Sequence, residues 1–312
     1  MGSTGGTFKG GYTPDKYKEI LRKTASQTID IAYETAVNEL INNVLAESAR
    51  DADRTNEHLD RIKGTLEDGI DGTLIMRFGG SVHKHTYVDG LSDIDILVVV
   101  NRSELNEENP NQILNYIANK LHNASVSGIS ELRIGELAVT VEFSDGEKIQ
   151  LLPALKHNDG YKIPGKGNSW SNMIRPEKFA NKLTEVNQSC GGKVVPVIKL
   201  AKNIIYELPE DQQITGYHIE SLAVEAFKNY PQTGSRAPKN MLNYLFEKSK
   251  DLVKDPIADE TGQSLHVDDY LGPKDSKERQ KISYVLDRIS RRMKNADRAS
   301  SIDEWKAILG LE

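Results

Sequence analysis

The sequence predicts an α+β protein in which a mixed sheet-and-helix lobe precedes an α-helical lobe. Up to about residue 155 short apolar runs of strand length alternate with helical patterns, whereas from residue 176 onward apolar residues recur only at helical spacing. A chain of 312 residues with 38% hydrophobic content is long enough to bury a core in each of two lobes. We place the lobes at residues 1–165, including a long N-terminal helix, and 166–312.

The elements of the first lobe follow from periodicity and from turn residues. Helical spacing of apolar residues, with a cap or stop signal nearby, predicts helices at about 13–48, 53–66 and 112–122. Apolar runs bounded by Gly, Pro, Asn and Asp predict strands at about 73–78, 92–100, 137–143 and 148–155. The strand at 92–100 is continuously apolar, which indicates burial on both faces. The last two strands are joined through Ser144-Asp145-Gly146 and read as an antiparallel hairpin.

The second lobe contains helices alone. Periodic apolar segments are predicted as helices at about 176–187, 193–207, 217–229, 237–252 and 275–296. The change of pattern near residues 160–178 marks the boundary between the lobes.

Composition narrows the classes of function. The formal charge of -6 and the pI near 5.8 argue against indiscriminate binding to nucleic acid. The single cysteine, Cys190, excludes a disulfide framework and a cysteine zinc cluster, which suits a cytoplasmic protein. No apolar stretch is long enough to cross a bilayer, so we expect no membrane association.

Two carboxylates head the most apolar predicted strand. Asp93 and Asp95 stand at i and i+2, so on a strand their side chains share one face while Ile94 points to the other. Two neighbouring carboxylates repel each other unless a cation lies between them, and hard oxygen ligands suit Mg²⁺ or Mn²⁺. Upstream, the Gly79-Gly80-Ser81 turn offers backbone N–H groups and a hydroxyl to phosphate oxygens.

The order "GGS", then eleven residues, then "DID" and an apolar strand resembles the signature of the DNA polymerase beta type nucleotidyltransferases. Within that superfamily the chain is most similar to the bacterial cGAS/DncV-like nucleotidyltransferases (CD-NTases), which synthesise cyclic oligonucleotides. The hairpin ending "IQLLPAL", the segments "VVPVIKLAKNIIYEL" and "ITGYHIESLAVEAF", and "DDYLG" extend the likeness over residues 75–296. The resemblance implies a polymerase beta-like mixed sheet, a helical lobe, and an active site in the cleft between them.

The resemblance also implies roles for individual residues. Gly80 and Ser81 would grip the phosphates of the donor nucleotide, and Asp93 and Asp95 would bind the metal ions. Lys202 falls where relatives place a lysine that faces the triphosphate, and Lys199, three residues earlier, would assist. Tyr217 falls at the position of an aromatic residue that stacks on a base. A solvated lysine at 202 and a packed core ring at 217 are the alternatives.

The third metal ligand departs from the pattern of the relatives. Gln150 stands where they usually carry a carboxylate, and an amide brings no charge and cannot act as a general base. Glu142, on the partner strand, is the candidate substitute as a catalytic residue. A three-residue turn would pair Glu142 with Lys148 and place it on the same face as Gln150, whereas a two- or four-residue turn would pair it with Ile149 and turn it away.

The resemblance implies synthesis of a cyclic di- or trinucleotide from ATP, with other ribonucleoside triphosphates as further candidate substrates, in bacterial antiphage signalling. A regulatory protein partner is expected, and duplex nucleic acid is not, because the sequence shows no zinc-ribbon insertion and no basic platform. Two alternatives stay open. The chain could transfer a nucleotide to tRNA or a small molecule, or it could bind nucleotides without turnover.

Overall fold

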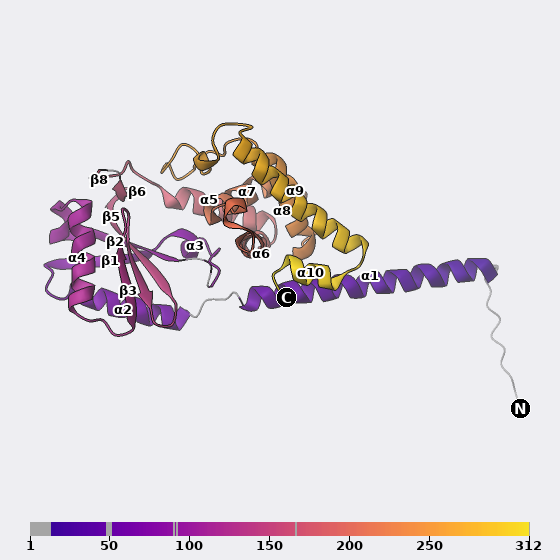
Figure 1. The fold of residues 1–312 in the computed structure, drawn as a ribbon, viewed down its shortest axis with the longest axis horizontal. Helices are drawn as coiled ribbons and strands as arrows, with labels where there is room; N and C mark the ends of the chain where they lie inside the picture. Colours follow the sequence, from indigo (N-terminus) through magenta and orange to yellow (C-terminus); the bar gives the residue numbers. More distant parts are fainter. Residues whose placement is uncertain (1–13, 48–51, 90, 92, 166, 312) are drawn as a thin grey trace, which may run out of the picture.

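The computed structural model describes residues 14–311 except 48–51, 90, 92 and 166. A mixed sheet with its covering helices lies at one end of the molecule, and a group of helices lies at the other (Figure 1). The strands are β1 (Gly72–Phe78), β2 (Ile94–Ser103), β3 (Ile129–Ile134), β4 (Val139–Phe143), β5 (Lys148–His157), β6 (Gly160–Lys162), β7 (Pro164–Gly165) and β8 (Ser169–Trp170). The α+β fold class predicted from the sequence is confirmed.

Helices make up the rest of the regular structure. The α-helices are α1 (Pro14–Glu47), α2 (Ala52–Glu67), α3 (Gly80–His83), α4 (Pro110–Asn123), α5 (Pro176–Ser189), α6 (Val194–Tyr206), α7 (Gly216–Phe227), α8 (Pro238–Leu252), α9 (Lys277–Arg298) and α10 (Ile302–Ile308). The described part of the chain also forms the short 3₁₀ helices η1 (Glu104–Glu107), η2 (Glu210–Gln212) and η3 (Asp269–Leu271). No described helix combines the length and the apolar character that crossing a membrane requires.

The sheet is built around β2. Its strand order is β1-β2-β5-β4-β3, with β6 paired to β5; β2 and β5 run parallel, and the other pairs are antiparallel. One face of β2, including Ile94 and Ile96, packs in a core with α2 and α4, whereas Leu97 and Val99 join a smaller apolar cluster on the opposite face. The predicted burial of this strand on both faces is therefore observed.

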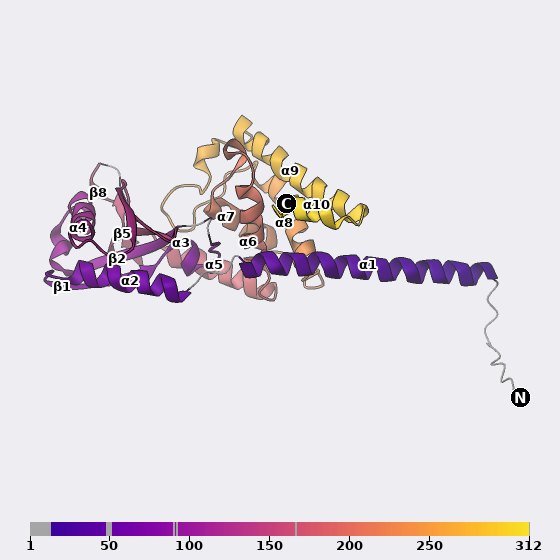
Figure 2. The same ribbon diagram turned by 60° about the horizontal axis from the view of Figure 1, so that its bottom comes forward.

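The N-terminal helix packs with the helical lobe. Tyr33, Val37, Ile41 and Val44 of α1 are buried in the same core as side chains of α6, α8 and α10. The first half of α1 projects beyond that core (Figures 1 and 2). The lobe boundary placed at residue 165 groups this helix with the sheet, whereas the helix packs against the second lobe. An amphipathic pattern indicates that one face of a helix is buried, but it does not indicate which element covers that face.

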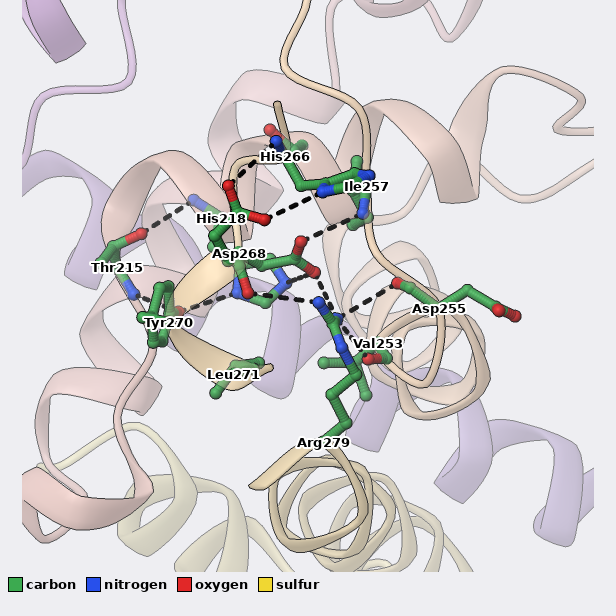
Figure 3. Close-up of polar contacts among 12 residues, drawn as sticks. Thr215, His218, Val253, Asp255, Ile257, His266, Asp268, Tyr270, Leu271 and Arg279 are labelled. Carbon is green, nitrogen blue, oxygen red and sulfur yellow. Dashed lines mark hydrogen bonds and ion pairs between the residues drawn. The ribbon is translucent and has the colours of Figure 1, made fainter. Parts of the chain in front are cut away.

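A buried polar network fastens the loop before α9 to the helical lobe. The guanidinium of Arg279, on α9, donates to the Asp268 carboxylate at 2.6 Å and to the carbonyl oxygens of Val253 at 3.0 Å and Gly272 at 2.9 Å. Figure 3 shows the contacts of Arg279 with Asp268 and Val253 together with His218, whose Nδ1 lies 2.9 Å from the Tyr270 hydroxyl. Burial lowers the pKa of His218 to about 4, so the imidazole is neutral at physiological pH.

We expect Arg279→Ala to destabilise the protein strongly. Arg279 and Asp268 are both 0% exposed, and removal of the cation would leave a buried carboxylate and several carbonyl oxygens without their donor. The free energy of unfolding, measured by urea denaturation, should fall by about 3–5 kcal/mol.

The matched control is Arg291→Ala on the same helix, where the arginine forms an exposed ion pair with Asp287. It should change the free energy of unfolding by less than about 1 kcal/mol. Equal effects of the two substitutions would contradict the structural role assigned to Arg279.

Candidate active site

The turn between β1 and α3 lies directly against β2. The N–H of Gly79 donates to the backbone carbonyl of Asp95 at 2.7 Å. Gly80 has φ +47°, and a Cβ at this position would lie 1.6 Å from Asp95 Oδ2. Only glycine fits there, since a side chain would both strain the backbone and collide with the carboxylate. The glycine of the predicted phosphate turn and the second aspartate are thus immediate neighbours.

Asp93, Asp95 and Gln150 lie together on one face of the sheet. Gln150 stands opposite Asp95 across the parallel β2–β5 ladder, and its Nε2 donates to Asp93 Oδ2 at 2.5 Å. Burial raises the pKa of Asp95 from 3.8 to about 6; the positive charge of Lys84 opposes this shift, and the negative charge of Asp93 adds to it. Ionisation of Asp95 therefore destabilises the folded protein, and a bound cation would offset this loss of stability.

The hairpin between β4 and β5 has the three-residue turn, one of the alternatives that the sequence left open. Glu142 pairs with Lys148, and Thr140 is the β4 residue opposite Gln150. The Glu142 carboxylate lies 3.1 Å from Arg133 Nη2 and 3.6 Å from Lys148 Nζ. The register puts Glu142 on the face of Gln150, but two cations already neutralise it there.

A cavity of about 290 Å³ opens beside the turn and is lined by both lobes. Gly80, Lys84 and Asp95 line it from the mixed lobe, and Phe179 and Tyr217 line it from the helical lobe. The Tyr217 hydroxyl donates to Asp259 at 2.8 Å, and its ring packs edge-to-face against Phe179 with 4.9 Å between centroids. The ring of Tyr217 is therefore fixed in orientation at the wall of the cavity.

A second cavity, of about 500 Å³, adjoins Asp93. Its walls include Arg54, Tyr87 and Lys148 from the mixed lobe and Tyr206 from α6. Asp95 thus lines one cavity and Asp93 the other, so the two carboxylates stand between two spaces that could each hold a ligand.

Two lysines share one buried carboxylate behind the turn. Lys202 Nζ lies 2.8 Å from Glu220 Oε1 and 2.9 Å from the Thr86 carbonyl oxygen. Lys84 forms an ion pair with the other oxygen of Glu220. Lys202 is therefore buried and paired rather than solvated, and Lys199, one turn earlier on α6, is half-buried. Neither Lys84 nor Glu220 was predicted from the sequence as a site residue. The one sequence feature that pointed to Lys84 was its position, three residues after Ser81 of the predicted phosphate turn.

The donor set suits a hard divalent cation that is completed by a substrate. Among the described residues no three His, Cys, Asp or Glu side chains are grouped so as to hold a metal ion alone. Asp93 and Asp95 offer carboxylate oxygens, the kind of ligand that Mg²⁺ and Mn²⁺ prefer, and Mg²⁺ commonly takes its further ligands from water and substrate phosphates. The residues present therefore fit a metal held jointly with a phosphorylated ligand.

We expect Asp95→Asn to stabilise the unliganded protein at neutral pH. Since the pKa of Asp95 is raised from 3.8 to about 6 on folding, stability is lost as the pH rises through that interval and stays lower above it. The substitution should raise the free energy of unfolding by on the order of 2 kcal/mol near pH 7.5, and by much less near pH 4.

Thermal unfolding without divalent cations measures the effect, with Asp251→Asn, at an exposed position, as the control. An Asp95→Asn gain that is absent near pH 7.5, or larger near pH 4, would contradict the raised pKa.

Comparisons with known proteins found likeness in structure alone. No protein-family model matches the sequence, and no curated protein matches it. A solved structure of the CdnE c-di-GMP synthase from Capnocytophaga granulosa has a TM-score of 0.63 and 20% identity, over 92% of this chain and 95% of that chain. CdnC of Escherichia coli MS115-1 with ATP has a TM-score of 0.59 and 17% identity, over 86% and 97%.

The DncV cyclic AMP-GMP synthase of Vibrio cholerae, solved with a linear intermediate, has a TM-score of 0.58 and 12% identity, over 96% of this chain and 90% of that chain. Each comparison covers both lobes of this chain, not the sheet alone. The chain therefore has the fold of the bacterial CD-NTases, a polymerase beta-like mixed-sheet lobe followed by an α-helical lobe, as the sequence resemblance predicted.

Proposed function

We propose that this chain is a metal-dependent nucleotidyltransferase that joins ribonucleoside triphosphates, ATP among them, into a cyclic di- or trinucleotide. The observation that carries the proposal is the close approach of Asp95 to the Gly80 turn, with one cavity lined by Asp95 and a second lined by Asp93. That arrangement would provide a phosphate seat, a cation site and a separate space for each of two nucleotides. The similar solved structures include a c-di-GMP synthase, a cyclic AMP-GMP synthase and a c-UMP-AMP synthase, so the fold is compatible with several base choices.

The donor nucleotide would occupy the cavity beside the turn. Backbone N–H groups of the turn, whose Gly79 and Gly80 line this cavity, would bind its phosphates, and the fixed ring of Tyr217 would stack on its base. Ser81 is not among the residues that line the cavity, so its hydroxyl would reach the phosphates from the edge of the turn. A ribose hydroxyl of an acceptor nucleotide in the second cavity would attack the α-phosphorus, and pyrophosphate would leave. The acceptor would thus approach from the side of Asp93.

Asp93 and Asp95 would hold Mg²⁺ or Mn²⁺ at the boundary between the two nucleotides. The bound ion would supply positive charge to the phosphates and lower the pKa of the attacking hydroxyl. Asp95, with its pKa near 6, is ionised at neutral pH and so ready to bind a cation. We assign to Gln150 the task of orienting Asp93 through its amide hydrogen bond.

Glu142 was the sequence-based candidate for a third catalytic carboxylate, but the residues around it favour a structural role in the sheet. Its ion pairs with Arg133 and Lys148 join β4 to β3 on one side and to β5 on the other. In that position Glu142 would support the hairpin without touching the metal or the substrate.

A nucleotide-binding module without turnover is the second candidate. It is favoured by the amide of Gln150 beside the Asp93 and Asp95 carboxylates, since the described residues bring no third metal-binding side chain into this group. We further propose a regulatory protein partner and a place in antiphage signalling; one similar structure is a CdnC:HORMA complex.

We expect the purified protein with Mg²⁺ and labelled ribonucleoside triphosphates to form a phosphatase-resistant product without an added acceptor. Asp93→Ala and Asp95→Ala should each lower the rate by about 1,000-fold or more, because each removes a ligand of the cation. Asp251→Ala, at an exposed carboxylate, is the control. Dependence on tRNA or a small-molecule acceptor, or binding without any turnover, would overturn the proposal in favour of the alternatives.

We expect Gln150→Ala and Glu142→Gln to differ in activity. Loss of the Gln150 hydrogen bond should lower the rate by about 10- to 100-fold, because Asp93 would lose its orienting partner. Glu142→Gln should leave the rate within about threefold, since it weakens only partly exposed ion pairs. Steady-state rates at saturating Mg²⁺ measure both, and a larger loss in Glu142→Gln would restore Glu142 as the catalytic candidate.

A further inference from the structure

The ammonium group of Lys84 lines the cavity and has more N–H donors than its contact with Glu220 occupies. Lys84 follows α3 and lines the cavity beside Gly80 and Asp95, with its side chain 12% exposed. Among the contacts of the described residues, Glu220 is its one ion-pair partner, and its Nζ also lies 4.8 Å from the centroid of the Tyr217 ring. A lysine has three N–H donors, so Lys84 retains donors for a ligand in the cavity.

Lys202 has no donor to spare. Its Nζ donates to Glu220 Oε1 at 2.8 Å, to the Thr86 carbonyl oxygen at 2.9 Å and to Thr86 Oγ1 at 3.3 Å. Its side chain is 7% exposed, and it does not line the cavity that contains Gly80 and Asp95. Contact between Lys202 and a phosphate in that cavity would require it to leave three buried acceptors.

Lys84, Lys202 and Glu220 together carry one positive charge in excess, and the carboxylate of Asp95 lies beside Lys84 in the same cavity. Glu220 is 1% exposed and needs a positive partner, because an unpaired buried carboxylate is strongly destabilising. Lys202 alone satisfies that need. Once a metal cation neutralises Asp95, the charge of Lys84 is available to an anion, and the seat for phosphates at Gly80 lines the same cavity.

We propose that Lys84 binds the triphosphate group of the donor nucleotide, and that Lys202 is a positioning residue that keeps Glu220 neutralised when Lys84 turns toward the phosphates. The inference rests on the proposed function and names the side chain that would supply cationic recognition in its donor site. Glu220 would hold Lys84 beside the turn before the nucleotide arrives. Lysine is a suitable phosphate ligand because its compact charge and flexible stem can follow the phosphate chain.

The test is binding of a non-hydrolysable ATP analogue with Mg²⁺, compared with binding of adenosine, by titration calorimetry. Lys84→Met should weaken binding of the analogue by about 10- to 100-fold and change adenosine binding little, since a charge-assisted hydrogen bond to phosphate is lost. Lys84→Arg should retain most of the affinity. Lys178→Met, at an exposed lysine of α5 outside the cavity, is the matched control and should bind like the wild type.

A second comparison separates the two lysines. The double variant K202M/E220Q removes a buried cation together with its buried anion and also takes from Lys84 the carboxylate that holds it, so it should lose affinity for the analogue, but clearly less than Lys84→Met does, if Lys84 is the ligand. Thermal unfolding checks that each variant is folded, and Lys84→Gln repeats the test if Lys84→Met folds poorly.

Three outcomes would overturn the inference. Lys84→Met could bind the analogue like the wild type, K202M/E220Q could lose affinity while Lys84→Met does not, or Lys84→Met could lose adenosine and analogue equally. The first two, with a wild-type protein that binds and turns over nucleotides, leave the proposed function intact. A folded wild-type protein that binds no nucleoside triphosphate would instead overturn both.

Discussion

The close approach of the Gly79-Gly80 backbone to Asp95 is the constraint on which the candidate site depends. A backbone hydrogen bond of 2.7 Å joins Gly79 to Asp95, and the space beside Gly80 admits no side chain. The groups suited to phosphate and the group suited to a cation are therefore held together by main chain rather than by flexible side chains. The Glu220 cluster then ties the same turn to the helical lobe through Lys84, so both walls of the cavity are positioned from one short segment.

The charges of the site determine which kind of ligand it favours. Burial and the neighbouring carboxylate of Asp93 disfavour an ionised Asp95, while two lysines share a single buried glutamate a short distance away. In the unliganded site, a cation would therefore stabilise the ionised carboxylate of Asp95, and an anion would find a positively charged partner in Lys84. A metal-bound polyphosphate would satisfy both, and neither a bare metal nor a bare phosphate would do so alone.

The strongly periodic parts of the sequence were enough to predict the fold. Features with a weak pattern, or that depend on contacts between distant residues, were not predicted. The continuous apolar run of β2 indicated its burial on two faces, and the two same-face aspartates followed from strand geometry alone. By contrast, β3 carries mostly exposed side chains at the sheet edge and gave no alternation to detect. The ion pair of Lys202 with Glu220 depends on how α6 packs against α7, and the Glu142 register depends on turn length; neither can be read from local pattern.

The central claim is that Asp93, Asp95 and the Gly80 turn bind a metal–nucleotide complex. A crystal structure of the protein with Mn²⁺ and a non-hydrolysable ribonucleoside triphosphate, with data collected at the manganese absorption edge, tests it most directly. The account predicts an anomalous peak bridging the two carboxylates and the phosphates, with the phosphate chain against the turn. Nucleotide density elsewhere, or manganese bound away from both aspartates, would contradict it.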